Sequence, residues 1–294
     1  MSDRLWGCGT ALVTPFTRDG DVDERALASL VDWQIAQGIH FLVPCGSTGE
    51  AATMSPDEQA RVVSVVAEQA AGRVVVMAGA GSNDTRRAVA TSRAMRDAGA
   101  TALLHVSPMY NKPPQRGIVE HFRAVADATE LPVVVYNVPG RTASNIEPRT
   151  TLALAEVPHI AGIKEASGSL TQIQEILRER PPHFSVLSGD DALTLGVMAA
   201  GGDGVISVVS NAVPALMSRL VELCRAARFD EARTLHERLL PWMGAAFVES
   251  NPIPVKAALA LMGRIENVLR LPLVPLDARH EGALREALWT CGAL

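Results

Sequence analysis

The feature that most limits how this sequence can fold is a repeated alternation of short apolar runs with longer amphipathic stretches, from near residue 9 to about residue 226. Several amphipathic stretches begin with Ser, Asp or Pro and end with Gly, which are the usual start and stop signals of helices. The apolar runs are hydrophobic throughout, as in parallel strands that are covered on both faces. The runs lie at 9–16, 40–46, 73–81, 100–108, 131–139, 160–167, 184–191 and 204–211.

Eight strand–helix units within roughly 230 residues fit a (β/α)8 TIM barrel better than an open doubly wound sheet, which is the competing arrangement. After residue 226 the apolar runs stop, and three further stretches predict helices only: 230–250, 254–263 and 278–292. We therefore predict an α/β fold with two domains, a (β/α)8 barrel at 1–226 that carries the active site and a small C-terminal helical domain at 227–294.

Composition excludes several classes of function. The net charge is -5 and no basic run exists, which argues against a nucleic-acid surface. The N-terminal residues lack a signal segment, and no apolar run is long enough to span a membrane. The four cysteines lack CxxC spacing and the seven histidines form no HxH or HExxH pair. We expect a cytoplasmic protein with unpaired thiols, no metal, and neither nucleic acid nor membrane as a partner.

Lys164 stands at the end of an otherwise apolar run, in the segment VPHIAGIKEASGSL at 157–170. The chain has only three lysines, Lys112, Lys164 and Lys256, among 27 Lys and Arg residues. Because arginine supplies most of the positive charge, a lysine at this position suggests that an amine is wanted for itself. A strand-end lysine that snorkels to solvent is the competing interpretation. For Lys256, nothing better than a surface position in the C-terminal domain suggests itself.

In a TIM barrel the active site lies at the carboxyl ends of the strands. Both tyrosines of the chain, Tyr110 and Tyr136, fall at such ends, as does Lys164. Burial lowers the pKa of a lysine and makes its neutral amine available. Such an amine forms a Schiff base with a ketone, and the neighbouring carbon then loses a proton to give an enamine. Tyr136, one strand away, is a plausible acid or base for these steps.

The turn GSTGE at 46–50 offers the hydroxyls of Ser47 and Thr48 and several backbone N–H groups, which together can hold a small carboxylate. An ordinary glycine-rich turn is the competing interpretation. Arg141 follows the run at 131–139 and is either a surface charge or a clamp for a second carboxylate. The segment GAGSND lacks the third glycine and the later acidic residue of a dinucleotide fingerprint, so we reject a nucleotide site there.

Taken together, the motifs GSTGE, YNVPGRT, GIKEASG, SGDD and NPIPVK, in this order, resemble the dihydrodipicolinate synthase and N-acetylneuraminate lyase family of pyruvate-dependent class I aldolases. The resemblance covers nearly the whole chain. It implies that Lys164 forms the Schiff base with pyruvate and that no separate cofactor is needed. It also implies a proton relay of Tyr136, Ser47 and Tyr110, in which Tyr110 comes from the neighbouring subunit.

Further roles follow from the same resemblance. Thr48 and the backbone at Ile206 match the pyruvate-binding positions, and Gly189 lies in the matching turn near the site. Arg141 matches the residue that holds the carboxylate of L-aspartate 4-semialdehyde. The implied assembly is a homotetramer built as a dimer of dimers, and the borrowed Tyr110 requires at least a dimer.

The implied reaction is a lyase-class condensation of pyruvate with L-aspartate 4-semialdehyde to 4-hydroxy-tetrahydrodipicolinate, in lysine and diaminopimelate biosynthesis. One alternative is a pyruvate-dependent lyase or dehydratase of a 2-keto-3-deoxy sugar acid or N-acetylneuraminate. The other is a barrel that binds 2-oxo acids without turning them over. A Schiff-base lysine flanked by two tyrosines argues against this second alternative.

Feedback-sensitive members of the family bind free lysine at the dimer interface. They often carry histidines at the positions of Pro56 and Gln59, glutamate at Arg87 and tyrosine at Met109. A like charge at Arg87 opposes an ammonium ligand, so we expect weak or absent inhibition by lysine. The positions that match this effector site are Ala52, Pro56, Gln59, Gly81, Asn83, Arg87 and Met109.

Overall fold

The computed structural model describes residues 4–294, and within them eight parallel strands close into a barrel in chain order. The first strand pairs with the eighth, which closes the ring and confirms the predicted TIM barrel over the open sheet. Seven of the strands lie inside the predicted apolar runs, and β1 begins two residues before its run. The strands are β1 Gly7–Ala11, β2 Phe41–Val43, β3 Val75–Gly79, β4 Ala102–Val106, β5 Val133–Asn137, β6 Ile160–Glu165, β7 Ser185–Ser188 and β8 Gly204–Ser207.

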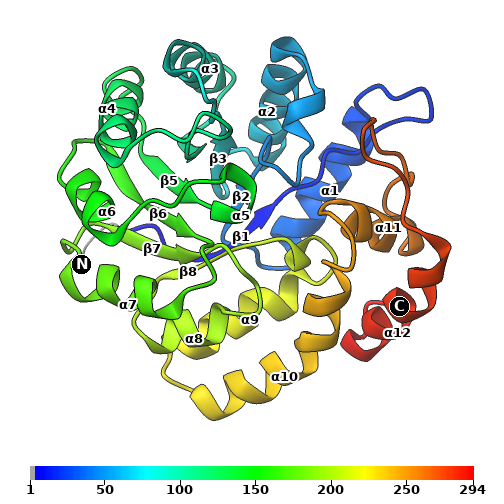
Figure 1. Ribbon diagram of the computed structural model, residues 1–294. Helices are drawn as coiled ribbons and strands as arrows, with labels where there is room; N and C mark the ends of the chain where they lie inside the picture. Colours follow the sequence, from blue (N-terminus) through cyan, green and yellow to red (C-terminus); the bar gives the residue numbers. More distant parts are fainter. Residues whose placement is uncertain (1–3) are drawn as a thin grey trace.

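Helices surround the barrel, as Figure 1 shows. Polar caps fix where several of them begin: the Asp23, Asp84 and Ser169 side chains each accept a backbone N–H of the first turn, and Ser55 forms a capping box with Glu58. The helices are α1 Glu24–Ala36, α2 Pro56–Ala70, α3 Thr85–Asp97, α4 Gln115–Ala126, α5 Pro139–Thr142, α6 Pro148–Ala155, α7 Leu170–Glu179, α8 Thr194–Ala199 and α9 Pro214–Arg225, with 3-10 turns η1 Ala51–Thr53 and η2 Val209–Asn211.

The apolar core has two parts, one between the strands and the surrounding helices and one inside the barrel. The inner part includes Phe41, Leu187, Ile206 and the ring of Tyr136. A Cβ added at Gly9 would lie 1.9 Å from the Phe41 ring, so this glycine makes room for the ring to fill the barrel. Packing inside the barrel therefore holds the Tyr136 ring and Ile206 in place.

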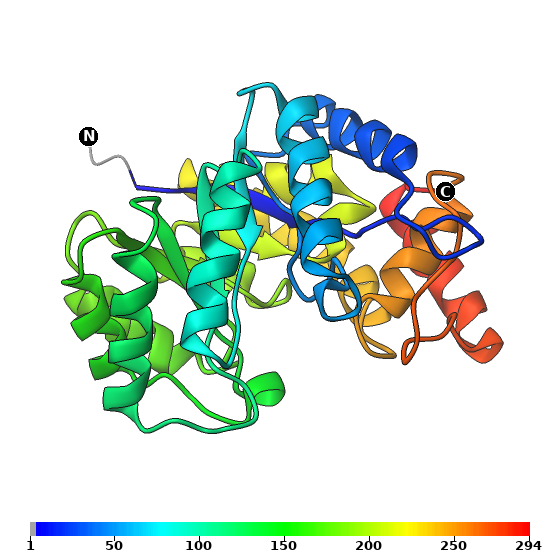
Figure 2. The same cartoon turned by 90° about the horizontal axis from the view of Figure 1, so that it is seen from above.

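The C-terminal part of the chain is helical and gathers at one side of the barrel (Figures 1 and 2). It consists of α10 Phe229–Ala245, α11 Ile253–Leu261, η3 Ala278–His280 and α12 Glu281–Cys291.

The predicted helix at 230–250 is too long, because α10 ends at Ala245. The N–H groups of Phe247 and Val248 bond three residues back, which ends the helix in a turn before Pro252. A division into two domains at residue 226 stays a prediction. Of the helices within 4–294, none combines the length and the hydropathy that crossing a membrane would need.

Candidate active site

Lys164 lies near the carboxyl end of β6, with Tyr136 beside it on β5 and Leu187 on β7. Its side chain is only 5% exposed, so it does not snorkel to solvent. The Nζ atom lies 4.3 Å from the centroid of the Tyr136 ring. The structure thus brings together the amine and the aromatic side chain that the sequence placed on neighbouring strand ends.

Burial lowers the pKa of Lys164 to about 8, while the carboxylate of Asp191 raises it and the Arg141 guanidinium lowers it further. Desolvation is the largest cause, since an ammonium in the barrel loses hydration. With this pKa, about a tenth of the amine is neutral at pH 7. A side chain of this kind can act as a nucleophile near neutral pH.

Asp191 is a site residue that sequence reasoning missed. It is 1% exposed, and its Oδ2 accepts the N–H groups of Val208 at 3.0 Å and Val209 at 3.3 Å. Burial raises its pKa to about 6. The carboxylate therefore fixes the chain directly beyond Ile206, at the end of β8. Its position as the second Asp of SGDD was the available signal.

Tyr136 is 8% exposed, and burial raises the pKa of its phenol to about 12. The hydroxyl therefore stays protonated at neutral pH and can donate a proton or a hydrogen bond.

The turn at 46–50 follows β2 and presents two different hydroxyls. Ser47 is exposed, whereas Thr48 is buried and its Oγ1 accepts a 2.9 Å hydrogen bond from Asn251 Nδ2. Arg141, in α5, donates from Nη2 to the Asn251 carbonyl at 3.4 Å. Asn251 thus links the turn to the arginine, a role that its motif NPIPVK did not reveal from sequence.

Gly189 follows β7 and lies against the lysine stem. A Cβ added there would be 3.1 Å from both Cγ and Cε of Lys164 and 2.6 Å from the Ala166 Cβ. Glycine at this position leaves the space that the lysine side chain occupies. Ile206 on β8 is fully buried inside the barrel.

Tyr110 is placed differently from the other site residues. It is 88% exposed, and its backbone adopts a left-handed φ of 73°. Among residues 4–294 its hydroxyl makes no hydrogen bond, so the single chain does not join it to Tyr136 or Ser47.

The positions matching the effector site lie around η1, the start of α3 and the loop after β4. The Gln59 amide donates to the carbonyls of Ala51 and Met54, so it braces its own loop. Gly81 and Met109 are half-buried, whereas Ala52, Pro56, Asn83 and Arg87 are exposed.

Lys256 is not a surface lysine, so that expectation was wrong. Its side chain is fully buried in α11, with Nζ 2.6 Å from Glu50 Oε1 and 2.9 Å from the Thr14 carbonyl. A charge can be buried here because it is paired and hydrogen-bonded. Within 4–294, no group of three or more His, Cys, Asp or Glu residues could hold a metal ion.

Comparison with known proteins adds independent information. Residues 4–290 match the Dihydrodipicolinate synthetase family. The 4-hydroxy-tetrahydrodipicolinate synthase of Prosthecochloris aestuarii is 49% identical, over 98% of this chain and 97% of that protein. The chloride-inhibited dihydrodipicolinate synthase of Acinetobacter baumannii, solved in complex with pyruvate, superposes with a TM-score of 0.97 at 41% identity, over 98% of this chain and 99% of that one. The dihydrodipicolinate synthase of Cyanidioschyzon merolae, solved with lysine bound, superposes with a TM-score of 0.96 at 41% identity. The match covers 99% of this chain and 100% of that one.

Proposed function

Because this chain belongs to the dihydrodipicolinate synthetase family, we propose that it condenses pyruvate with L-aspartate 4-semialdehyde to 4-hydroxy-tetrahydrodipicolinate, in lysine and diaminopimelate biosynthesis. It is an enzyme of the lyase class, like the relatives that carry the synthase name. The observation that carries the proposal is the buried Lys164 amine, whose pKa is lowered to about 8 inside a closed barrel.

Lys164 supplies the covalent chemistry. Its neutral amine attacks C2 of pyruvate, and loss of water from the resulting carbinolamine gives an iminium ion. The iminium withdraws electrons from C3, which loses a proton to form an enamine. The enamine carbon attacks the aldehyde carbon of the second substrate, and the aldehyde oxygen takes up a proton. Attack of that substrate's own amine on C2 then closes the ring and releases Lys164. The chemistry needs no separate cofactor.

Proton transfer is assigned to Tyr136, Ser47 and Tyr110. The phenol of Tyr136 is protonated at neutral pH and lies beside Lys164, which suits a donor to the carbinolamine oxygen. The exposed Ser47 and the exposed Tyr110 extend this relay only when a second subunit supplies the tyrosine.

Different residues bind the carboxylates of the two substrates. Thr48 and the backbone of Ile206 are assigned to the pyruvate carboxylate, and Gly189 leaves room for the Lys164 stem. Arg141 binds the carboxylate of the semialdehyde, since a guanidinium recognises a carboxylate with two parallel hydrogen bonds.

We propose that the enzyme is a homotetramer built as a dimer of dimers, and at least a dimer. The support for at least a dimer is Tyr110, an aromatic side chain that is 88% exposed on a left-handed backbone and suits burial against a second copy. The second interface of the tetramer is proposed from the family resemblance alone. A cytoplasmic location is proposed on the four cysteines, all of which are free and buried.

Free lysine is expected to inhibit weakly or not at all. Arg87 is exposed and repels an ammonium group, and Gln59 is already engaged by its own loop. Initial rates measured against lysine concentration test this, with Arg87→Glu expected to increase sensitivity. Strong inhibition of the natural protein at submillimolar lysine would contradict the expectation.

The substrate proposal is tested by supplying pyruvate with either L-aspartate 4-semialdehyde or a sugar aldehyde such as N-acetylmannosamine, and measuring pyruvate consumption. We expect rapid consumption with the semialdehyde and little with the sugar. The reverse preference would assign the chain to the sugar-acid lyases, and pyruvate binding without consumption would leave a non-catalytic barrel.

A further inference from the structure

The second buried lysine of the chain is used in a different way from Lys164. Lys256 and Glu50 both have side chains with 0% exposure, and their charged atoms lie 2.6 Å apart. The other carboxylate oxygen of Glu50 accepts the N–H of Arg270 at 3.1 Å. Neither charge is left without a partner, yet such a buried pair contributes little net stability compared with apolar residues of similar volume. Stability alone therefore does not account for this buried pair.

Glu50 is the last residue of the turn that carries Ser47 and Thr48. Two non-glycine residues in the left-handed region bound this turn: Cys45, directly before it, with φ 56°, and Glu50, at its end, with φ 54°. Such conformations cost free energy and persist only where surrounding contacts hold them. Strain of this kind at a substrate-binding turn indicates that its shape matters.

The contacts that hold this turn come largely from one segment of the C-terminal part, 251–256. Asn251 donates to the Thr48 hydroxyl oxygen, and Lys256 binds the Glu50 carboxylate. Because the oxygen of Thr48 accepts from Asn251, its own hydrogen is free to donate elsewhere. Thr14 adds a third contact, from its hydroxyl to the Gly49 carbonyl at 2.7 Å, and its own carbonyl accepts from Lys256 at 2.9 Å.

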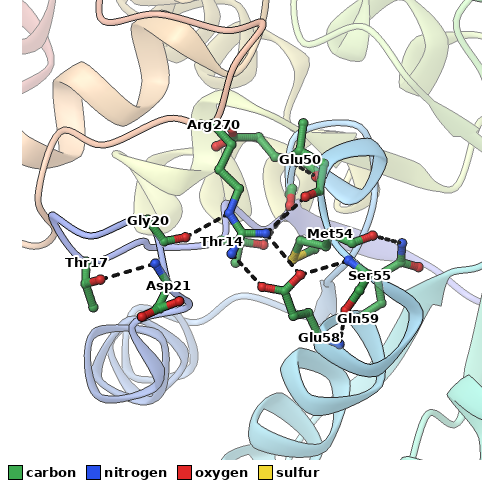
Figure 3. A network of polar contacts seen from close by, with 12 residues as sticks. Thr14, Thr17, Gly20, Asp21, Glu50, Met54, Ser55, Glu58, Gln59 and Arg270 are labelled. Carbon is green, nitrogen blue, oxygen red and sulfur yellow. Dashed lines mark hydrogen bonds and ion pairs between the residues drawn. The ribbon is translucent and has the colours of Figure 1, made fainter.

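Arg270 extends this arrangement to the start of α2 and to the loop before α1, as Figure 3 shows. Its guanidinium donates to Glu58 at 2.5 and 3.1 Å, to the Thr53 carbonyl at 3.0 Å and to the Gly20 carbonyl at 2.8 Å. The ring of Phe16 lies within cation–π distance of both Lys256, at 4.2 Å, and Arg270, at 4.4 Å. The cations of Lys256 and Arg270 are thus balanced in charge by the carboxylate of Glu50, at the end of the turn, and by that of Glu58 in α2.

We propose that Lys256 is a positioning residue for pyruvate binding, which acts through Glu50 to hold the 46–50 turn with the Ser47 and Thr48 hydroxyls facing the substrate carboxylate. The inference rests on the proposed function. It assigns Lys256 no contact with substrate and no part in the Schiff base, and it makes the C-terminal segment part of the pyruvate site.

The test uses Lys256→Met and the double variant Glu50→Gln/Lys256→Met, with Lys112→Met as a control because Lys112 is exposed. The single variant leaves Glu50 buried without a counter-charge, whereas the double variant removes both charges with little change of volume. Each protein is incubated with increasing pyruvate, reduced with borohydride and assayed for the pyruvate adduct. The same proteins are assayed for steady-state kinetics and thermal unfolding.

For the double variant we expect near-normal thermal stability, a pyruvate half-saturation raised about tenfold, and kcat and the KM for the aldehyde within about threefold of the natural protein. A purely structural pair would predict recovery of pyruvate binding together with stability, and that result would overturn the proposal. Rescue of pyruvate binding by Lys256→Arg, which restores a cation, supports it.

The outcomes separate this proposal from the proposed function. If the natural protein forms no pyruvate adduct at all, the proposed aldol chemistry fails. If the natural protein and the double variant form the adduct with the same half-saturation, only the positioning role of Lys256 fails.

Discussion

The barrel mouth around Lys164 and the contact between the barrel and α11 around Lys256 both bury a lysine, with different consequences. Lys256 has a carboxylate 2.6 Å away, whereas Lys164 has the Tyr136 ring and only the more distant influence of Asp191. Burial lowers the pKa of both lysines, but the Glu50 carboxylate opposes this for Lys256 and engages its ammonium. Burial alone therefore does not make a lysine nucleophilic; burial without a close counter-charge does.

The largest effect that separates the two regions is expected from Lys164→Met, which removes the amine at the barrel mouth. Activity should fall by at least about a thousandfold, because the covalent step is lost. Stability should be maintained or increased: an ammonium whose pKa falls from 10.5 to about 8 on folding costs about 3 kcal/mol at pH 7. That cost disappears as pH rises from 8 towards 10.5, so the difference between the two proteins should narrow there. Urea unfolding at pH 7 and pH 10 measures it, and a variant less stable at pH 7 would contradict the account.

Gly189→Ala tests how tightly the Lys164 stem is enclosed. The added methyl group would lie 2.6 Å from the Ala166 Cβ, so the chain at Ala166 must shift. It would also lie 3.1 Å from two carbons of the Lys164 stem, and we expect this crowding to move the amine. We expect kcat/KM to fall by about a hundredfold. Gly244→Ala in α10 is the matched control, because nothing lies within 4 Å of its added Cβ. Equal activity of the two variants would show that the lysine stem has room to adjust.

Lys256→Met should lower the stability of the fold and keep the Schiff-base chemistry, which is the reverse of the result expected for Lys164→Met. Loss of the ammonium leaves Glu50 buried and unpaired, which should destabilise the fold by roughly 3–5 kcal/mol. At saturating pyruvate the folded fraction should still form the adduct on Lys164, because Lys256 takes no part in the Schiff base. Urea unfolding alongside adduct mapping checks both parts. An unchanged free energy of unfolding would mean that the ion pair is not buried as described.

The smallest effect is expected from Asp191→Asn, as a shift in pH dependence. The rate of adduct formation should rise with pH, reach half of its maximum near pH 8 and level off about one pH unit above that, because only the neutral amine reacts. Asp191 raises the pKa of Lys164, so its amide variant should move this rise to lower pH. Initial rates of borohydride-trapped adduct between pH 6 and 9.5 measure the shift, with the exposed Glu156→Gln as control. If the rate rises over the same pH range in the variant, Asp191 does not influence the pKa of Lys164.

Sequence reasoning predicted the barrel well because its signals are local. Apolar runs, helix caps and strand-end residues such as Tyr136 and Lys164 can be recognised within a few neighbours along the chain. The burial of Lys256 could not be recognised in this way, since its partner Glu50 is 206 residues away. The contact of Asp191 with the chain beyond β8 is likewise made by folding. The scarcity of lysine, which drew attention to Lys164, applied equally to Lys256 and was the one available clue.

Whether Lys164 is the Schiff-base lysine is tested by incubating the natural protein with pyruvate, reducing it with borohydride and mapping all three lysines by mass spectrometry. We predict a pyruvate adduct on Lys164 alone, because Lys112 is exposed outside the barrel mouth and Lys256 is paired with Glu50. An adduct on Lys256 or Lys112, or none on Lys164 in the folded protein, would contradict it.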